Sequence, residues 1–287
     1  MYRSLPGMAD FQLSINGRIW VSTEDNHRRE AHSVGYVDIH SHVLYGLDDG
    51  ANTCEQSVQM LEIAARSGTT DIVATPHANG QYAFDPEMIE QRIAELSEKT
   101  TVRIYPGCDF HLQFDNIEDA LTDPEKYTIN HKVYLLVEFA DLSIFSETDA
   151  ILMRLLDAGI VPIITHPERN ARLQRKLDDL ARWVDFGCYV QVTASSYVGS
   201  FGRAAQACAH DLMKRGLTHF VASDAHDCRL RRPSLREAYA WLAERWGEES
   251  IRPLFEDNPK AVLMGDAIDF EFPRSAVKTR KWYRFWA

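Results

Sequence analysis

The sequence has 287 residues, of which 45% are hydrophobic and 25% charged, a mixture that excludes a chain disordered along its whole length. Lys and Arg number 31 and Asp and Glu 42, so the formal charge is 31 − 42 = −11, which argues against general nucleic-acid binding because a phosphate backbone requires a basic face. There is no apolar run of the roughly 18 residues that cross a membrane, no secretory signal and no C-x-x-C pair among the five cysteines, so we expect a soluble, cytoplasmic protein with reduced thiols.

Residues 1–35 show little hydrophobic periodicity, and they are predicted to be an N-terminal extension whose order the sequence leaves open. Between residues 36 and 270 one pattern repeats, because short apolar runs recur about every 30 residues and alternate with segments of helical spacing. Runs such as VYLLVEF and VPIITH are nearly continuous in Val, Ile and Leu, which is typical of parallel strands covered on both faces. The runs begin near Val37, Asp71, Val102, Val133, Ile160, Tyr189 and His219.

Helical segments fall between these runs, at residues 54–68, 148–159, 177–187 and 203–216. Each ends in glycine, the residue favoured just past a helix C-terminus. Strands and helices that alternate in one rhythm predict βα units and a parallel sheet. Seven units without a change of composition favour a single α/β domain, a distorted (β/α)7 TIM-like barrel, over a doubly wound sheet. Trp183, Trp241 and Trp246 lie in helical segments and are expected to pack against the core.

The C-terminal ends of the predicted strands are rich in side chains that bind metals, and in α/β barrels reactive groups project from this end. The first run ends with His40 and His42, whose imidazoles point to one side of an extended strand. Asp48 and Asp49 follow in the loop, and the sixth run, YVQVTASS, supplies no evident ligand. The other runs end with His77, Asp109, Glu138, His166, Asp224 and His226.

Each of these residues alone has an ordinary structural explanation. A single histidine at a strand end is more often a hydrogen-bonded core residue than a ligand, Asp-Asp-Gly is a common turn, and Glu138 could pair with a cation. Together, five histidines and several carboxylates at corresponding ends of successive strands favour a metal centre, because burying so many ionisable groups is costly unless cations neutralise them.

The types of ligand indicate the chemistry. Histidine and carboxylate ligands without cysteine suit Mn, Fe, Zn or Co rather than a structural zinc. Nine candidates exceed the ligands of one ion, so two or three neighbouring ions are expected, which suits hydrolysis of phosphate esters. Arg169 and Arg231, which follow His166 and Asp224 in sequence, are candidates for binding phosphoryl oxygens. The alternative explanation for both arginines is that they form ordinary ion pairs on the protein surface.

The segments HSHVLYGLDDG, TPH, VEF, THPERN and SDAH resemble motifs of the polymerase and histidinol phosphatase (PHP) superfamily. The similarity is greatest to its capsule-locus branch, the metal-dependent bacterial protein tyrosine phosphatases of the CpsB/CapC family, and it extends from Val37 to Met264. The resemblance implies a distorted seven-stranded barrel with three divalent ions, usually manganese. It also implies hydrolysis of phosphotyrosine on a protein by metal-bound hydroxide.

The resemblance also implies how the ligands are shared. Two features of this sequence depart from the family pattern. Asp109 stands where the family usually has Glu, whose side chain is longer by one methylene, and an N-terminal extension such as residues 1–35 is uncommon in the family. Arg169 and Arg231 match the family's phosphate-binding arginines. The first ion would take His40, His42, Asp109 and Asp224, the second Asp109, Glu138 and His166, and the third Asp49, His77 and His226.

Other enzyme classes and a non-catalytic role remain as alternatives. No cysteine is followed by arginine six residues later, so the C-x5-R site of cysteine-dependent phosphatases is not present, which predicts inhibition by chelators and resistance to thiol alkylation. The nearest rival is a small-molecule phosphatase of the same superfamily, acting on histidinol phosphate or a sugar phosphate. A phosphodiesterase fits the acidic composition poorly, and an interaction protein with a degenerate site fits the near-complete ligand set poorly.

Residues 271–287 form a basic, aromatic C-terminal tail. Residues 274–287 carry +5 without an acid, which leaves 26 − 42 = −16 on residues 1–273. A basic tail with aromatic residues suits binding to a membrane surface or to an acidic partner. The alternatives are that the tail docks on the acidic remainder of the chain or is disordered. By the resemblance, the partner is the phosphotyrosine tail of a membrane-bound bacterial tyrosine kinase in capsule and exopolysaccharide regulation, which would place the protein at the inner face of the membrane.

Overall fold

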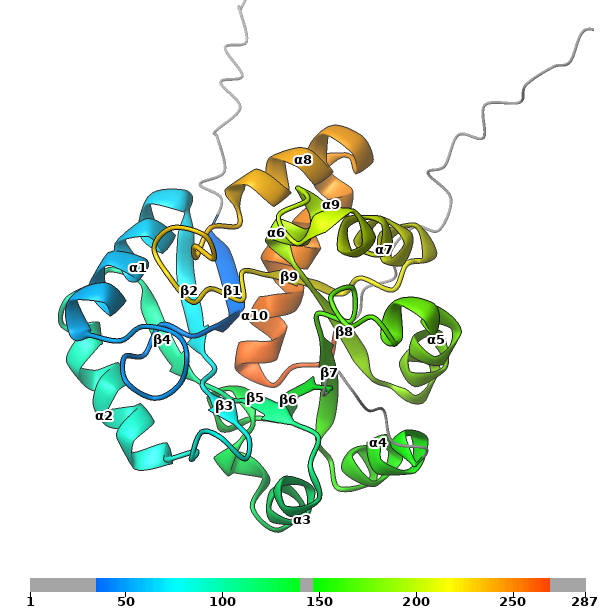
Figure 1. The fold of residues 1–287 in the computed structure, drawn as a ribbon, viewed down its shortest axis with the longest axis horizontal. Helices are drawn as coiled ribbons and strands as arrows, with labels where there is room; N and C mark the ends of the chain where they lie inside the picture. The colour runs from blue at the N-terminus through cyan, green and yellow to red at the C-terminus, as the bar shows by residue number, and fades with distance from the viewer. Residues whose placement is uncertain (1–34, 140–146, 269–287) are drawn as a thin grey trace, which may run out of the picture. The chain divides into compact units, whose positions relative to one another are not determined.

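The computed structural model describes residues 35–139 and 147–268, and its β-strands form two sheets in which every pairing is parallel (Figure 1). The first sheet has the order β1-β2-β4, with β1 at Tyr36–Ser41, β2 at Thr69–Ala74 and β4 at Arg103–Pro106. The second has the order β3-β5-β6-β7-β8-β9, with strands at His77–Ala78, Asp109–His111, Tyr134–Glu138, Val161–Thr165, Tyr189–Thr193 and Phe220–Ala222.

Two of the predicted runs are broken into two strands each, and the breaks carry the chain from one sheet to the other. Residues 75–76 separate β2 from β3, and residues 107–108 separate β4 from β5. At the second break a Cβ on Gly107 would lie 2.7 Å from Cγ1 of Val73, so only glycine fits without displacing β2. The breaks place His77 and Asp109 on the second sheet, at the start of β3 and β5.

Backbone hydrogen bonds also join β1 to the chain just after β9. The Asp224 N–H donates to the His40 carbonyl, and the His42 N–H donates to the Ala225 carbonyl, each over 2.8 Å. Ser41 and Ala225 form a parallel bridge. The predicted parallel α/β architecture is therefore confirmed, while a closed ring of seven strands remains a prediction.

Helices connect the strands and surround them in Figure 1. The four predicted helical segments are confirmed as α1, α4, α5 and α7, each followed within two residues by a glycine with positive φ. At the start of α1 the Thr53 hydroxyl accepts the Gln56 N–H over 3.3 Å, an N-cap that satisfies a free helix donor. The helices are α1 (Cys54–Ser67), α2 (Pro86–Ser97), α3 (Phe114–Thr122), α4 (Thr148–Asp157), α5 (Leu177–Phe186), α6 (Ala194–Tyr197), α7 (Gly202–Arg215), α8 (Arg236–Trp246), α9 (Glu248–Phe255) and α10 (Asp257–Met264).

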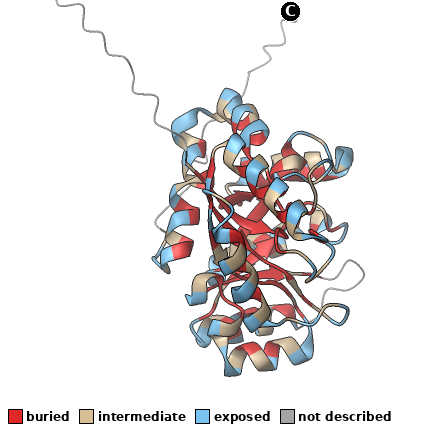
Figure 2. Cartoon of the chain, turned by 90° about the vertical axis from the view of Figure 1, so that its left-hand side faces the viewer, coloured by how far each residue is buried: buried red, intermediate tan, exposed pale blue. Residues whose placement is uncertain are grey.

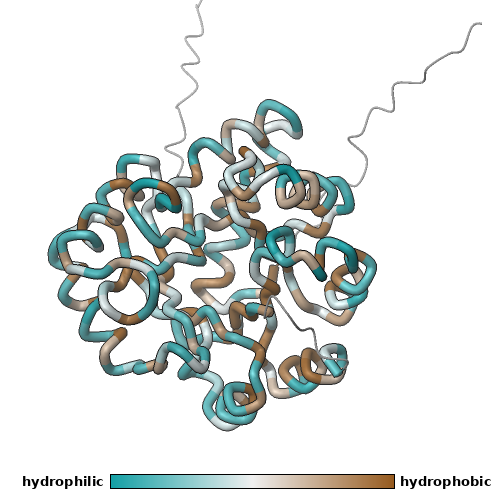
Figure 3. Tube along the Cα trace, viewed as in Figure 1, coloured by the Kyte–Doolittle hydropathy of each residue, from teal (hydrophilic) through white to brown (hydrophobic). Residues whose placement is uncertain are grey.

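The core has an inner part between the strands and outer parts beneath the helices. Figure 2 shows the strands buried and the outer faces of the helices exposed, and Figure 3 shows the matching change from apolar to polar residues. Trp183 is buried, and Trp241 and Trp246 pack partly buried against the same cluster, as predicted. The inner core contains Val37, Ile39, Val73, Leu136, Ile163, Phe220 and, from α10, Val262 and Leu263.

Two predicted segments lie outside the described residues. They are the N-terminal extension, of which only residue 35 is described, and the C-terminal tail, residues 271–287. The domain boundaries at residues 36 and 270 therefore remain predictions. Among the described residues, no helix has the length and apolar character to span a membrane.

Candidate metal centre

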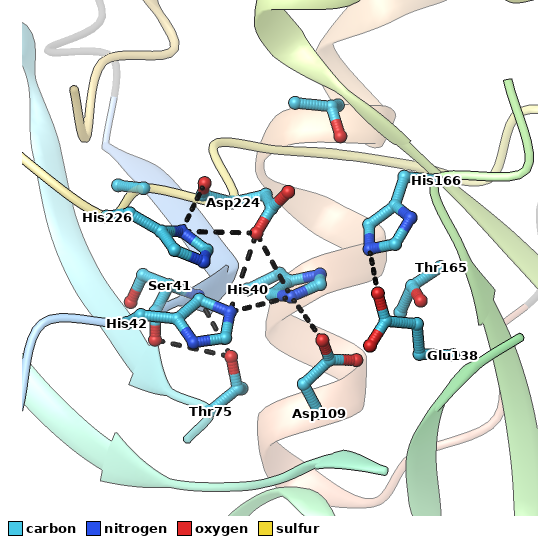
Figure 4. A network of polar contacts seen from close by, with 12 residues as sticks. His40, Ser41, His42, Thr75, Asp109, Glu138, Thr165, His166, Asp224 and His226 are labelled. Carbon is cyan, nitrogen blue, oxygen red and sulfur yellow. Dashed lines mark hydrogen bonds and ion pairs between the residues drawn. The ribbon is translucent and has the colours of Figure 1, made fainter. Parts of the chain in front are cut away.

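All nine predicted ligands lie close together, some at the C-terminal ends of strands, His77 and Asp109 at the start of β3 and β5, and Asp49 in a loop. Figure 4 shows the side chains of His40, His42, Asp109, Asp224 and His226 pointing toward one another, with the Glu138–His166 pair beside them. Within the described residues, four overlapping groups have ligand atoms within 4.8 Å of one another. These groups are His42, Asp49, His77 and His226; His40, Asp109 and His166; His40, His42 and Asp224; and His77, His111 and Glu138.

The contacts of Glu138 agree only in part with the sharing that the resemblance implies. Its Oε1 lies 3.5 Å from His166 Nε2, but it also groups with His77 and with His111, which was not among the predicted ligands. His111 forms an ion pair with Glu138, and the sequence analysis missed it. The signal was present, since Asp109 and His111 are separated by one residue on β5, as His40 and His42 are on β1. Side chains at that spacing point to the same side of a strand.

Several buried polar atoms in this cluster make no hydrogen bond. They are both carboxylate oxygens of Asp109 and Nδ1 of His77, whereas Oε2 of Glu138 is the atom that forms the ion pair with His111. His77 Nδ1 lies 3.2 Å from Asp109 Oδ2 and 3.6 Å from Glu138 Oε2, so these atoms converge without pairing in hydrogen-bond geometry. An unsatisfied buried donor or acceptor costs about 1–3 kcal/mol and requires an explanation. Divalent ions bound by nitrogen and carboxylate oxygen would satisfy all of them.

Electrostatics couple the histidines to the carboxylates. Burial acts to lower the pKa of His42, but the carboxylates of Asp48 and Asp224 outweigh it and raise that pKa to about 10. Burial lowers the pKa of His166 well below its usual value, and the Arg169 cation adds to this effect. For Glu138, burial and the charge of Asp109 raise the pKa. Such opposite shifts within one cluster are typical of functional sites.

Two side chains behind the cluster orient its first two histidines. The Gln191 Oε1 atom lies 3.0 Å from His40 Nδ1, and Asp48 Oδ2 lies 2.6 Å from His42 Nδ1. Each contact leaves Nε2 facing the cluster, which is how a second layer of residues fixes the tautomer of a ligand. Gln191 lies on β8, so the sixth predicted strand, to which no ligand was assigned, supports one from behind.

The structure also separates the roles of the two neighbouring aspartates. The carboxylate oxygens of Asp48 are already used within the protein, because they accept the N–H groups of Gly50 and His77 and contact His42. Asp49 Oδ1 instead lies 3.4 Å from His77 Nε2 and 3.5 Å from His226 Nε2. Asp49, unlike Asp48, thus faces two of the other predicted ligands, and its role as a ligand stays a prediction.

The backbone is bent at two strand ends. His166 and Asp224 have positive φ angles of 31° and 50°, a region that residues other than glycine rarely occupy. Hydrogen bonds hold both, from His166 N–H to the Gln191 carbonyl over 2.9 Å and from Asp224 N–H to the His40 carbonyl. Strain of this kind is characteristic of active sites.

The two predicted arginines lie at the edge of the cluster rather than on an open surface. Arg169 forms an ion pair with Asp224, and Arg231 Nη2 lies 2.6 Å from Asp224 Oδ2. The Phe201 ring covers the guanidinium of Arg169, with 4.3 Å from its carbon to the ring centre. Surface ion pairing therefore does not describe these contacts, since the Asp224 side chain is only 2% exposed.

Glu168, next to Arg169, is a buried residue that the sequence analysis missed. Its Oε1 atom accepts the Thr193 N–H over 3.1 Å and the Ser196 hydroxyl over 2.7 Å. Burial raises its pKa to about 7. These bonds attach the loop of Arg169 to the junction between β8 and α6. The sequence THPERN contained this residue, but only its position between His166 and Arg169 pointed to the site.

The cysteines have no part in this geometry. All five thiols are free, and those of Cys108, Cys188 and Cys208 are buried. Burial raises the pKa of Cys188 and of Cys208 to about 12, so neither supplies a thiolate, the reactive form, near neutral pH.

The fold and site together define an α/β protein with parallel strands and a candidate centre for several divalent ions at the strand ends. The chain belongs to the CpsB/CapC family, since the family described as "Capsular polysaccharide synthesis, CpsB/CapC" matches residues 36–264. The family resemblance found in the motifs is thereby confirmed.

Similar proteins span nearly the same length. A putative tyrosine-protein phosphatase, CapC, from Staphylococcus aureus is 31% identical over 86% of this chain and 98% of its own. The tyrosine-protein phosphatase YwqE from Bacillus subtilis is 31% identical over 87% of this chain and 99% of its own. The tyrosine-protein phosphatase CpsB from Streptococcus pneumoniae is 29% identical over 81% of this chain and 100% of its own.

Solved structures agree with the fold. One, from work on YwqE of Bacillus subtilis and CpsB of Streptococcus pneumoniae as "unique metal-dependent tyrosine phosphatases", has a TM-score of 0.75 and 31% identity, covering 82% of this chain and 96% of that one. An inactive dihydroorotase-like domain from Chaetomium thermophilum has a TM-score of 0.53 at 12% identity, covering 80% and 79% of the two chains. At that identity the second likeness shows the fold alone.

Proposed function

We propose that this protein is a metal-dependent protein tyrosine phosphatase, a phosphoric monoester hydrolase of the kind named among its relatives. The observation that carries the proposal is the convergence of buried atoms without hydrogen bonds on Asp109 and His77, beside the ion-paired carboxylate of Glu138. Buried groups of a core histidine or of a structural salt bridge are normally hydrogen-bonded, whereas the Asp109 oxygens and Nδ1 of His77 are not.

The residues present fit several divalent ions, and we propose three, most readily Mn2+, with Fe, Zn or Co as alternatives. Such ions would activate water and neutralise charge on the phosphoryl oxygens. Gln191 and Asp48 hold two of the ligands in place from behind. The proposed ligands are His40, His42, Asp49, His77, Asp109, Glu138, His166, Asp224 and His226, with His111 added from the structure.

Arg169 and Arg231 are the proposed catalytic residues that bind the phosphoryl group. Both are partly exposed, at 24% and 26% of their side chains, and both reach Asp224. A guanidinium in this position can bind phosphoryl oxygens through two N–H groups and offset their charge. Tyrosine has a pKa near 10, so the departing phenolate needs less help from an acid than an alkoxide would.

The larger organisation is also part of the proposal. The strand positions β1, β2–β3, β4–β5, β6, β7, β8 and β9 would form a distorted barrel of seven within a domain at residues 36–270. The phosphotyrosine tail of a membrane-bound tyrosine kinase would be the substrate, with the protein at the inner face of the membrane. If residues 274–287 aid this location, their deletion lowers binding to anionic vesicles and leaves turnover of a small aryl phosphate unchanged.

The decisive experiment compares initial rates on a phosphotyrosyl peptide, histidinol phosphate and a dinucleotide, with Mn2+ and then with a chelator. The proposal predicts that the peptide is the preferred substrate, that the chelator stops turnover and that iodoacetamide does not. His40→Ala should lower the rate at least about 100-fold, while His131→Ala, an exposed histidine paired with Glu90, should not. Preference for histidinol phosphate would favour the small-molecule phosphatase, and loss of activity with iodoacetamide alone would contradict the proposal.

A further inference from the structure

The loop at residues 227–232, which follows the ligand His226, presents an apolar side chain to solvent beside the metal centre. Leu230 is 88% exposed, the most exposed large hydrophobic side chain among the described residues. Arg231, the next residue, reaches into the centre and contacts Asp224. Leu230 is therefore the immediate chain neighbour of an arginine that reaches the centre, with consecutive Cα atoms about 3.8 Å apart.

This exposure belongs to a well-fixed loop. The Asp227 carboxylate accepts the N–H groups of Arg229, Leu230 and Arg231, over 2.5, 2.7 and 3.3 Å. The Arg231 carbonyl accepts the N–H groups of His226 and Asp227, over 2.9 and 3.1 Å. The hydrogen bonds therefore hold Leu230 outward, although an apolar side chain gains by burial.

Two hollows flank Leu230, and it lines both of them. One, of about 460 Å3, lies between the loop and the start of α1 and includes Gln56, Gln59 and Arg229. The other, of about 90 Å3, lies toward the turn after α6 and includes Val198, whose side chain is also exposed. The surface around the loop thus offers two depressions separated by one apolar side chain.

The loop is also positively charged on an acidic protein. The net charge of the chain is −11, yet residues 229–232 hold three arginines. Arg229 is exposed and, among the described residues, its side chain has no ion-pair partner. Arg232 pairs with Glu237 over 3.2 Å, with both side chains about half exposed. The unpaired cation of Arg229 can bind an acidic side chain, and the adjacent Leu230 can contact an apolar side chain of the same ligand.

We propose that the loop at residues 227–232 is the docking platform for the peptide around the phosphotyrosine, and this inference rests on the proposed function. With the phosphate at Arg169 and Arg231, a neighbouring apolar residue of an extended peptide packs on Leu230, and an acidic residue pairs with Arg229. The platform gives the enzyme a preference for phosphotyrosine in an acidic, partly apolar peptide over a free aryl phosphate.

The test measures kcat and KM of Leu230→Ala and Arg229→Glu on three substrates: a phosphotyrosyl peptide with Asp and Leu beside the phosphotyrosine, the same peptide with both replaced by Ala, and a small aryl phosphate. Leu230→Ala should raise KM for the first peptide about three- to tenfold with kcat kept. Arg229→Glu should remove the preference for the acidic peptide, and the preference of the wild type should weaken with salt. Met153→Ala on α4 and Arg66→Glu at the far end of α1 are matched controls and should change none of these values.

Each possible result of these kinetic measurements supports or contradicts the docking platform. If the wild type hydrolyses the peptides but Leu230→Ala and Arg229→Glu behave like their controls, the docking platform is contradicted while the proposed phosphatase function is retained. If the wild type hydrolyses only the aryl phosphate, the platform and the protein substrate both fail. An equal loss on peptide and aryl phosphate would show a damaged centre instead of a docking site, and it would also overturn the inference.

Discussion

Gly50 shows how closely the chain packs against His42, one of the proposed ligands. A Cβ on Gly50 would lie 2.2 Å from the His42 carbonyl oxygen and 2.6 Å from the His42 Cβ, and 3.0 Å from Asp48 Oδ1. Backbone atoms give way far less easily than the end of a flexible side chain. The glycine in the Asp-Asp-Gly turn is therefore required by the position of His42, beyond its suitability for a turn.

Gly50→Ala should consequently displace His42 and Asp48. We expect a loss of about 1–3 kcal/mol in the free energy of unfolding, typical of overpacking, together with a larger fall in kcat/KM than in stability. Urea unfolding and rates on an aryl phosphate measure both. Gly80→Ala is the matched control, because a Cβ there has nothing within 4 Å. Equal behaviour of the two variants would refute the argument.

Single residues also show which parts of the candidate site could be predicted from the sequence and which could not. The histidines at the ends of apolar runs were predictable, since a parallel strand must end there and its end faces the centre. His111 was missed because the third run was taken to end at Asp109, whereas β5 continues to His111. Gln191 was missed because its role depends on which atom of His40 it meets, and that depends on packing.

At the scale of elements, β8 is the strand that contributes support instead of a ligand. Gln191 on this strand pairs through its backbone with the end of β7 and, through Oε1, contacts His40 Nδ1. A fixed tautomer keeps His40 Nε2 available for the cluster.

We therefore expect Gln191→Leu to weaken metal binding about 10- to 100-fold, with the fold retained. Gln191→Glu, which keeps an acceptor for the same nitrogen, should retain more of the affinity. Titration of the metal-free protein with Mn2+ by calorimetry measures this. Full affinity in Gln191→Leu would show that the contact does not orient the ligand.

The residue just before β9 is a buried histidine, His219, whose role is structural. His219 Nδ1 accepts the Val190 N–H over 3.1 Å, and its carbonyl accepts the side-chain amide of Asn258 on α10 over 2.9 Å. Burial lowers its pKa to about 4. Since the folded state favours the neutral ring, this residue's stabilisation is complete above pH 6.5 and declines as the pH falls toward 4.

The wild type should thus lose about 2 kcal/mol more unfolding free energy between pH 7 and pH 5 than His219→Asn, which keeps an acceptor but does not titrate. Urea unfolding of both proteins in the same buffers gives the difference. Parallel pH profiles would mean that the ring is protonated without cost in the folded state.

The breaks in β2–β3 and β4–β5 mark the limit of prediction for elements. Hydrophobic periodicity located the runs and four of the helices, α1, α4, α5 and α7, because it reports burial along one segment. It did not indicate that Thr75–Pro76 and Gly107–Cys108 interrupt the ladder. Those breaks depend on contacts between segments, such as the approach of Gly107 to Val73.

In the molecule taken as one body, charge is concentrated in the centre, where side chains from both sheets meet. Buried carboxylates and imidazoles oppose one another there, and several of their atoms lack hydrogen bonds. A ligand that binds only the folded state stabilises it in proportion to its saturation. Metal ions should therefore stabilise the fold as well as enable catalysis.

Saturating Mn2+ should raise Tm by about 5–10 °C over the chelated protein, the shift expected from about 3 kcal/mol in a domain of this size. His40→Ala should lose most of this rise, and His131→Ala should keep it. Differential scanning calorimetry at matched protein concentration measures the effect. The same Tm with and without metal would mean that the cluster binds no ion.

If histidines and carboxylates from separate strands hold divalent ions together, crystals grown with Mn2+ and measured near the manganese absorption edge will show it most directly. We expect anomalous peaks about 2.0–2.2 Å from the nitrogen and oxygen atoms of His40, Asp109 and His226. An anomalous map without a peak among these side chains, from crystals soaked at saturating Mn2+, would contradict it.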